Sequence, residues 1–149
     1  MTSKRRPGFT LVEVLIVVVI MAVLAATIIP QFADSTNDAK TSTSKFNLHT
    51  LRSQIELYRS QHDGSLPSAD LSELNLKTDA SGNPNESGSS TFSFGPYLYE
   101  IPENPYTNSA TVKTATAPFT AGDCNDTDGW LYDSTSGEIA INRADLVTE

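Results

Sequence analysis

Residues 9–29 constrain this chain more than any other part of its sequence. The segment holds 21 residues and is apolar except for Thr10, Glu13 and Thr27. At a rise of about 1.5 Å per residue, a helix of this length crosses a bilayer core of about 30 Å. The sequence therefore predicts one membrane-spanning helix close to the N-terminus.

The charges around this segment predict its orientation. Lys4, Arg5 and Arg6 stand just before it, and the next base is Lys40. Because positive residues stay on the cytoplasmic side of a membrane, we expect a cytoplasmic N-terminus and an extracytoplasmic C-terminal part. The predicted topology is a single pass through the inner membrane.

Composition excludes several classes of protein. The chain has 149 residues, which is too few for two separate cores, and its one cysteine has no partner for a disulfide or at a zinc spacing. Residues 60–149 carry three bases against 14 acids, a net charge of −11, which disfavours binding to nucleic acid. No motif of a serine hydrolase, zinc protease or nucleotide-binding loop is present, so we expect no enzyme, and we expect His49 and His62 to be surface residues.

Glu13 separates the hypotheses for the apolar segment. A charged side chain costs about 2.5–3.5 kcal/mol near the centre of a membrane helix and less near the interface, so it needs a partner. A cut between Gly8 and Phe9 would create a positively charged α-amino group at the membrane depth of Glu13. The Glu13 carboxylate of a neighbouring copy can then pair with this charge. A secretory signal that leaves a chain starting at Ala26, and a plain signal anchor, are the alternatives, and neither explains Glu13.

The sequence RRPGFTLVEVLIVVVIMAVLAATIIPQF closely resembles the class III leader of type IV pilins and pseudopilins. The resemblance implies that a prepilin peptidase cuts after Gly8 and methylates Phe9, with the apolar helix left in place. It also implies that Glu13 pairs with the N-terminus of a neighbouring subunit during assembly, and that the helix bends at Pro30.

The helix is predicted to continue well beyond residue 29. An apolar face recurs down to Tyr58, and Asp63-Gly64 is a stop signal; the face consists of Leu48, Leu51, Ile55 and Tyr58. Together with the leader at 1–8 that the resemblance implies, we therefore expect an apolar helix at 9–29, its amphipathic continuation at 30–62 and a head at 63–149.

A basic stripe lies on another face of this continuation. Lys45, Arg52 and Arg59 recur every seven residues, with Glu56 between the last two. The stripe is either a solvated face with weak ion pairs or a contact surface for acidic neighbouring subunits.

The head is predicted to be a small antiparallel β structure packed on the helix, which makes the fold class α+β and pilin-like. Leu66-Pro67, with Leu71, Leu74 and Leu76, predicts a turn-rich segment against the helix, and residues 78–90 predict a loop. The aromatic segment 92–101 could form one strand, which its prolines confine to an edge, and residues 130–141 predict a hairpin.

The resemblance extends more weakly into the head, through IPENPYTN and the terminal hairpin, and there it favours the major pseudopilins of type II secretion systems. Type IVa adhesion pilins usually carry two C-terminal cysteines, and this chain has only one. Pilins without that disulfide exist, so a type IV pilus subunit for adhesion or motility remains the alternative. A secreted binding protein is the third hypothesis.

Major pseudopilins often hold calcium in the C-terminal loop, and this chain has AGDCNDTDGW there. Its oxygen-rich side chains suit the six to eight ligands of Ca²⁺, and the resemblance names Asp123, Asp126 and Asp128 as candidate ligands. A turn rich in Asp and Asn explains the same residues without a metal.

The resemblance implies a structural role. We expect a homo-oligomeric helical filament, stored in the membrane as single subunits and assembled in the periplasm or on the surface. The expected partners are the prepilin peptidase, an inner-membrane assembly platform, minor pseudopilins and, before assembly, membrane lipid.

Overall fold

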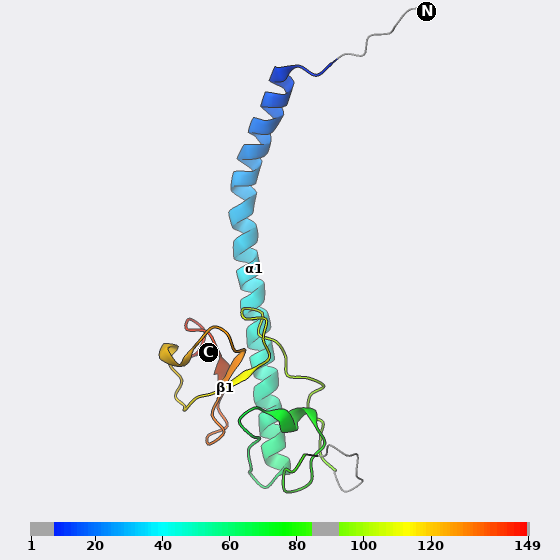
Figure 1. The fold of residues 1–149 in the computed structure, drawn as a ribbon, viewed down its shortest axis with the longest axis vertical. Helices are drawn as coiled ribbons and strands as arrows, with labels where there is room; N and C mark the ends of the chain where they lie inside the picture. The colour runs from blue at the N-terminus through cyan, green and yellow to red at the C-terminus, as the bar shows by residue number, and fades with distance from the viewer. Residues whose placement is uncertain (1–7, 85–92, 149) are drawn as a thin grey trace, which may run out of the picture. The chain divides into compact units, whose positions relative to one another are not determined.

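The computed structural model describes residues 8–84 and 93–148. One long helix, α1 (Leu11–Gln61), is followed by two short 3-10 helices, η1 (Ser72–Asn75) and η2 (Ala121–Asp123), and three short strands. The strands are β1 (Val112–Thr114), β2 (Trp130–Tyr132) and β3 (Ile139–Ile141). The predicted α+β, pilin-like fold class is confirmed (Figure 1). The chain divides into two compact units, one up to Ala39 and one from Lys40 onwards.

The first unit contains the apolar part of α1. Every described side chain from Phe9 to Ile29 is exposed, because nothing in this unit packs against the helix. By length and composition this is the one helix in the described residues that can cross a membrane. The basic residues that predict its orientation lie before Gly8, outside the described residues.

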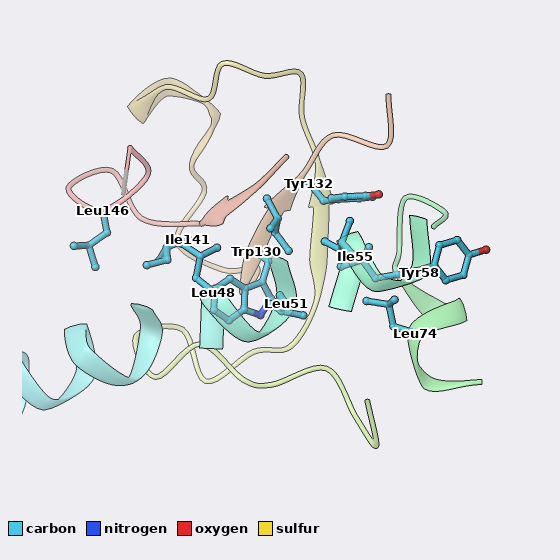
Figure 2. Close-up of a cluster of buried hydrophobic side chains, with 11 residues drawn as sticks. Leu48, Leu51, Ile55, Tyr58, Leu74, Trp130, Tyr132, Ile141 and Leu146 are labelled. Carbon is cyan, nitrogen blue, oxygen red and sulfur yellow. The ribbon is translucent and has the colours of Figure 1, made fainter. Parts of the chain in front are cut away.

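In the second unit, one face of α1 forms half of the core. Leu48, Leu51 and Ile55 are buried, and Figure 2 shows them facing side chains of β2 and β3. Trp130 anchors the other half, and its indole nitrogen donates a hydrogen bond of 2.8 Å to the carbonyl oxygen of Pro102. The helical spacing therefore predicted this face correctly.

The sheet is small and mixed, in the order β1-β2-β3. The predicted hairpin is confirmed, because β2 pairs with β3 antiparallel and Leu131 stands opposite Ala140. The prediction of a purely antiparallel head is wrong in one respect: β1 pairs with β2 in parallel, with Lys113 opposite Leu131. A parallel pair needs a crossover connection, and residues 115–129, which include η2, provide it.

The segment after α1 follows the sequence expectations at the end of the helix and at two of its leucines. Gly64 ends the helix with a φ of 86° while its N–H donates to the carbonyl oxygen of Arg59 at 2.9 Å. Leu71 and Leu74, from the predicted turn-rich segment, are fully buried in the core.

The aromatic segment forms no strand in its described part, residues 93–101, so that prediction is wrong there. Only an isolated bridge joins Phe94 to Thr78. The next backbone N–H groups turn away from any ladder, since Tyr97 and Leu98 both donate to the carbonyl oxygen of Leu74, at 2.8 and 2.9 Å. Pro96 has no N–H with which to continue a ladder.

His62 is not a surface residue, contrary to the sequence prediction. It is 1% exposed and its ring stacks on Tyr58 with 4.0 Å between centroids. Its Nδ1 lies 2.8 Å from the carbonyl oxygen of Tyr58, and its Nε2 lies 2.9 Å from the hydroxyl of Thr78. Because a carbonyl only accepts, Nδ1 is the donor in the contact with Tyr58. His49 is exposed, as expected.

The hairpin turn depends on the carboxylate of Asp133. The carboxylate accepts the N–H of Thr135 at 2.8 Å, the N–H of Ala117 at 3.1 Å and the hydroxyl of Ser136 at 3.1 Å. These donors, the Thr135 and Ala117 N–H groups first, hold the pKa of Asp133 below its ordinary value of 3.8. The charged carboxylate therefore ties the turn to the crossover connection.

Replacing Asp133 with Asn should destabilise the head at neutral pH and remove part of its acid sensitivity. A pKa that is lowered in the folded state gives stability above the unfolded pKa, and this stability is lost as the pH falls through the folded value. We expect the free energy of unfolding of the unmodified chain to fall more steeply below about pH 4 than that of Asp133→Asn. Chemical denaturation in detergent at a series of pH values measures both. Glu138→Gln, at an exposed neighbouring position, is the control, and equal pH slopes for all three proteins would contradict the assignment.

Candidate assembly site and acidic loop

The start of α1 is a capping box built by Thr10 and Glu13. The Glu13 carboxylate accepts the N–H of Thr10 at 2.8 Å and its hydroxyl at 2.7 Å, while the N–H of Glu13 donates to the Thr10 hydroxyl oxygen at 3.2 Å. The first turn of any helix has N–H groups without intrahelical partners, and this arrangement satisfies two of them. Sequence analysis identified Glu13 but missed Thr10, although a Thr three residues before a Glu is a capping signal.

The capping box places the one acidic side chain of the apolar segment at the very beginning of the helix. Gly8 and Phe9 precede it in non-helical backbone, and both are exposed. The peptide bond between them therefore lies outside the helix. The structure brings these three candidate residues within six positions at one end of the chain. Cleavage and methylation themselves stay predictions.

Pro30 lies inside α1, which runs without interruption from Leu11 to Gln61. A proline in a helix interior removes one backbone hydrogen bond. The bend at this residue stays a prediction.

The acidic loop, residues 123–128, connects η2 to β2. Asp123 closes a second capping box, since its carboxylate accepts the N–H and the hydroxyl of Thr120, both at 2.8 Å. The Asp128 carboxylate accepts the hydroxyl of Thr111 and the side-chain amide of Asn125, both at 2.6 Å. These hydrogen bonds lower the pKa of both carboxyl groups, so both are ionised at neutral pH.

Asn142 holds the loop and is a residue that sequence analysis missed. It is fully buried at the end of β3, where its amide donates to the side-chain oxygen of Asn125 at 2.5 Å and to the carbonyl oxygen of Asp128 at 2.9 Å. Its own side-chain oxygen accepts the N–H of Asn125 at 3.0 Å. An Asn after an alternating strand carries no signal by itself, because its role depends on a loop 17 residues earlier in the chain.

The candidate calcium ligands do not converge in this arrangement. Within the described residues no three acidic, histidine or cysteine side chains gather closely enough to hold a metal ion. Asp123 is directed to Thr120 and Asp128 to Thr111 and Asn125, so the two carboxylates serve different hydrogen-bond partners. The donor set as folded does not fit a three-carboxylate calcium site. Calcium binding stays a prediction from the family resemblance.

Cys124 lies within the acidic loop and is partly buried. Burial first, and then the charges of Asp126 and Asp123, raise the pKa of its thiol. Burial contributes more to this rise in pKa than the neighbouring acids do. A thiol with a raised pKa is a poor nucleophile.

Comparison with known proteins connects this geometry to a family. The family model for the prokaryotic N-terminal methylation motif matches residues 3–29, which include the Gly8–Phe9 bond, Thr10 and Glu13. The chain therefore carries the N-terminal methylation motif that this model describes. The capping box thus lies inside the motif of this family.

The chain also has relatives that match beyond the motif. It is 28% identical over 108 residues to the type II secretion system core protein G of Pseudomonas aeruginosa. The aligned region covers 72% of this chain and 73% of the relative. It is 26% identical over 110 residues to the protein of the same name from Aeromonas hydrophila, with the same coverage. A third protein of that name, from Dickeya chrysanthemi, is 32% identical over 57 residues, 38% of this chain and 37% of the relative. No solved structure matches the chain significantly.

Replacing Thr10 with Val should loosen the first turn of α1. The substitution removes the hydroxyl that the box needs, and the loss of a cap typically costs about 1 kcal/mol. Hydrogen exchange of the amides of residues 10–13 in detergent should then rise about fivefold. Thr27→Val is the matched control, because the Thr27 hydroxyl donates only to the carbonyl oxygen of Leu24 and caps no N–H group. Equal exchange in the two variants would contradict the capping role.

Proposed function

We propose that this chain is a pseudopilin, a structural subunit of a filament in a type II secretion machine. The observation that carries the proposal is the extent of the similarity to core protein G, since 108 aligned residues exceed the methylation motif and reach into the head. The chain acts by assembling through its N-terminal helix into a periplasmic pseudopilus that supports the export of proteins.

Processing is the first step of this function. A prepilin peptidase hydrolyses the peptide bond between Gly8 and Phe9, which leaves Gly8 with a carboxylate and Phe9 with an α-amino group. The exposure of both residues before the first turn of α1 supports access for the peptidase. Methylation of the new amino group keeps its basic nitrogen, so Phe9 remains a cation at neutral pH.

Assembly pairs this cation with the Glu13 of a neighbouring copy. An isolated carboxylate inside a membrane is costly, and a nearby opposite charge offsets that cost. Thr10 holds the Glu13 carboxylate at the helix start, next to the level of the new N-terminus. Apolar side chains of the same unit, exposed from Leu11 to Ile29, are available to pack against other copies or against lipid.

The location follows from the same helix. The chain is anchored in the inner membrane by residues 9–29, with its N-terminus in the cytoplasm and its head outside, before it enters the filament. The prepilin peptidase and an inner-membrane assembly platform act on it there, and minor pseudopilins join the same filament. The proposed role is structural rather than enzymatic, as in its relatives.

A pilus subunit for adhesion or motility is less well supported. The relatives that match 72% of this chain are named for type II secretion. The chain also lacks the second cysteine that a C-terminal disulfide requires. A secreted binding protein that starts at Ala26 would lack most of the methylation motif, which matches residues 3–29.

The protein isolated from its own membrane should begin at methylated Phe9. Removal of eight residues from 149 leaves 141, and one methyl group adds about 14 Da to the mass of that peptide chain. Intact-mass and N-terminal peptide analysis measures both changes. Gly8→Val should keep the full-length mass. A chain that starts at Ala26 would contradict the proposal.

Loss of the Glu13 carboxylate should stop assembly and export without stopping cleavage. In a strain that lacks the gene, Glu13→Ala should give the processed chain but no filaments, and secreted proteins should accumulate in the periplasm. Glu138→Ala, which removes an exposed carboxylate of the head, should restore export fully. Normal filaments from Glu13→Ala would contradict the pairing. Normal export in the strain that lacks the gene would contradict the function itself.

A further inference from the structure

The family resemblance and the folded acidic loop disagree about calcium. The resemblance names Asp123, Asp126 and Asp128 as ligands, and Ca²⁺ requires six to eight oxygen atoms at about 2.3–2.6 Å. Such a site needs the carboxylates to face one common point. The carboxylates of Asp123 and Asp128 instead face hydrogen-bond donors of the chain itself, in different directions.

Every oxygen of Asp128 that could reach an ion accepts a hydrogen bond. One carboxylate oxygen accepts the hydroxyl of Thr111 and the other accepts the side-chain amide of Asn125, both at 2.6 Å. The backbone carbonyl oxygen accepts the amide of Asn142 at 2.9 Å. Thr111 directly precedes β1 and Asn142 directly follows β3, so both strands that flank β2 are tied to this residue.

Lys113 brings a positive charge to the other end of the loop. Its ammonium group donates to the backbone carbonyl oxygen of Asp123. The carboxylate of Asp123 is directed to Thr120, since one of its oxygens accepts both the N–H and the hydroxyl of that residue at 2.8 Å. An ammonium group on a carbonyl oxygen repels a metal ion from it, because both are cations. Lys113 thus supplies a positive charge that a metal ion would otherwise bring.

The third candidate ligand has different surroundings. Asp126 lines a hollow together with Tyr106, Arg143 and Asp145, whereas the other two candidate ligands do not line it. The guanidinium of Arg143 lies 3.7 Å from the centroid of the Tyr106 ring and pairs with Asp145 at 2.5 Å. Asp126 therefore shares a hollow with a cation of the chain rather than with the other two carboxylates.

We propose that the head of this chain holds its acidic loop without calcium. The latch residues, which are Lys113, Asn142, Thr111 and Thr120, take the place of the metal ion. They give the loop the donors and the positive charge that bound calcium would give it. Amide and hydroxyl donors act in fixed directions, so they select one conformation of the loop. The inference concerns the head alone and does not require that the chain assembles.

The melting temperature of the full chain in detergent tests the independence from calcium. Extracellular calcium sites have dissociation constants of about 10⁻⁴–10⁻³ M, so we use about 10 mM calcium. A site at the tight end of this range would then raise the melting temperature by about 10 °C. The reference is EGTA with the same concentration of magnesium, which matches the effect of divalent salt. We expect the two melting temperatures to agree within about 1 °C, and a value about 5 °C or more higher in calcium would overturn the inference.

Two substitutions distinguish the latch residues from a metal site. Thr111→Val removes the hydroxyl that donates to Asp128 and keeps the shape of the side chain, so we expect a melting temperature lower by about 5 °C. Asn142→Leu removes both amide donors and should lower it further. Asp126→Asn is the matched control, because it removes a candidate ligand that no latch residue contacts in a hydrogen bond given above. We expect its melting temperature to stay within about 1 °C of that of the unmodified chain.

The outcomes separate the inference from the proposed function. A calcium site would make Asp126→Asn lose a rise in melting temperature that calcium gives to the unmodified chain, and this result would overturn the inference. Equal melting temperatures for the unmodified chain, Thr111→Val and Asn142→Leu would overturn the role of the latch residues. Because every measurement is made on the detergent-solubilised subunit, a failure to form filaments would overturn the proposed function and leave this inference standing.

Discussion

The packing of Trp130 against the buried face of α1 is the contact on which the head depends. The head has only three strands of three residues each, so the sheet cannot form a core alone. Leu48 and Leu51 give the sheet an apolar surface on which to pack, and Trp130 lies against it (Figure 2). The indole hydrogen bond of Trp130 also joins the sheet to Pro102. Helix, loops and sheet are therefore stabilised together.

Buried side-chain amides hold the loops in place, because the sheet is too small to do so. Asn104 is fully buried, donates to the carbonyl oxygen of Gly129 at 2.9 Å and accepts the N–H of Tyr106 at 3.0 Å. Asn142 holds the acidic loop in the same way. An amide both donates and accepts, so one side chain can satisfy several backbone groups that irregular structure leaves unpaired. This explains how a head with little regular structure keeps a defined conformation.

The sequence predicted those features that depend on local periodicity. The helix, its buried face, its end at Gly64 and the hairpin at Trp130 all repeat at a fixed spacing or carry a turn signal. It missed β1, His62 and Asn142, because their surroundings come from distant parts of the chain. Val112 becomes a strand residue only when β2 lies beside it, and His62 is buried only when Phe94 and Thr78 cover it. The acidic loop shows the same limit, since the spacing of its carboxylates did not reveal which donors they face.

The two units of this chain pose the same physical problem in different solvents. In the first unit Glu13 is a carboxylate among apolar side chains, and Thr10 satisfies it only in part, because hydrogen bonds do not neutralise a charge. In the second unit Phe46 and Tyr99 are apolar side chains in water, which no other part of the described head covers. A nearby positive charge would offset the cost of Glu13. Contact with another apolar surface would remove Phe46 and Tyr99 from water. In the proposed filament, the α-amino group of a neighbouring copy offsets the charge of Glu13, and the apolar side chains of that copy cover apolar surface.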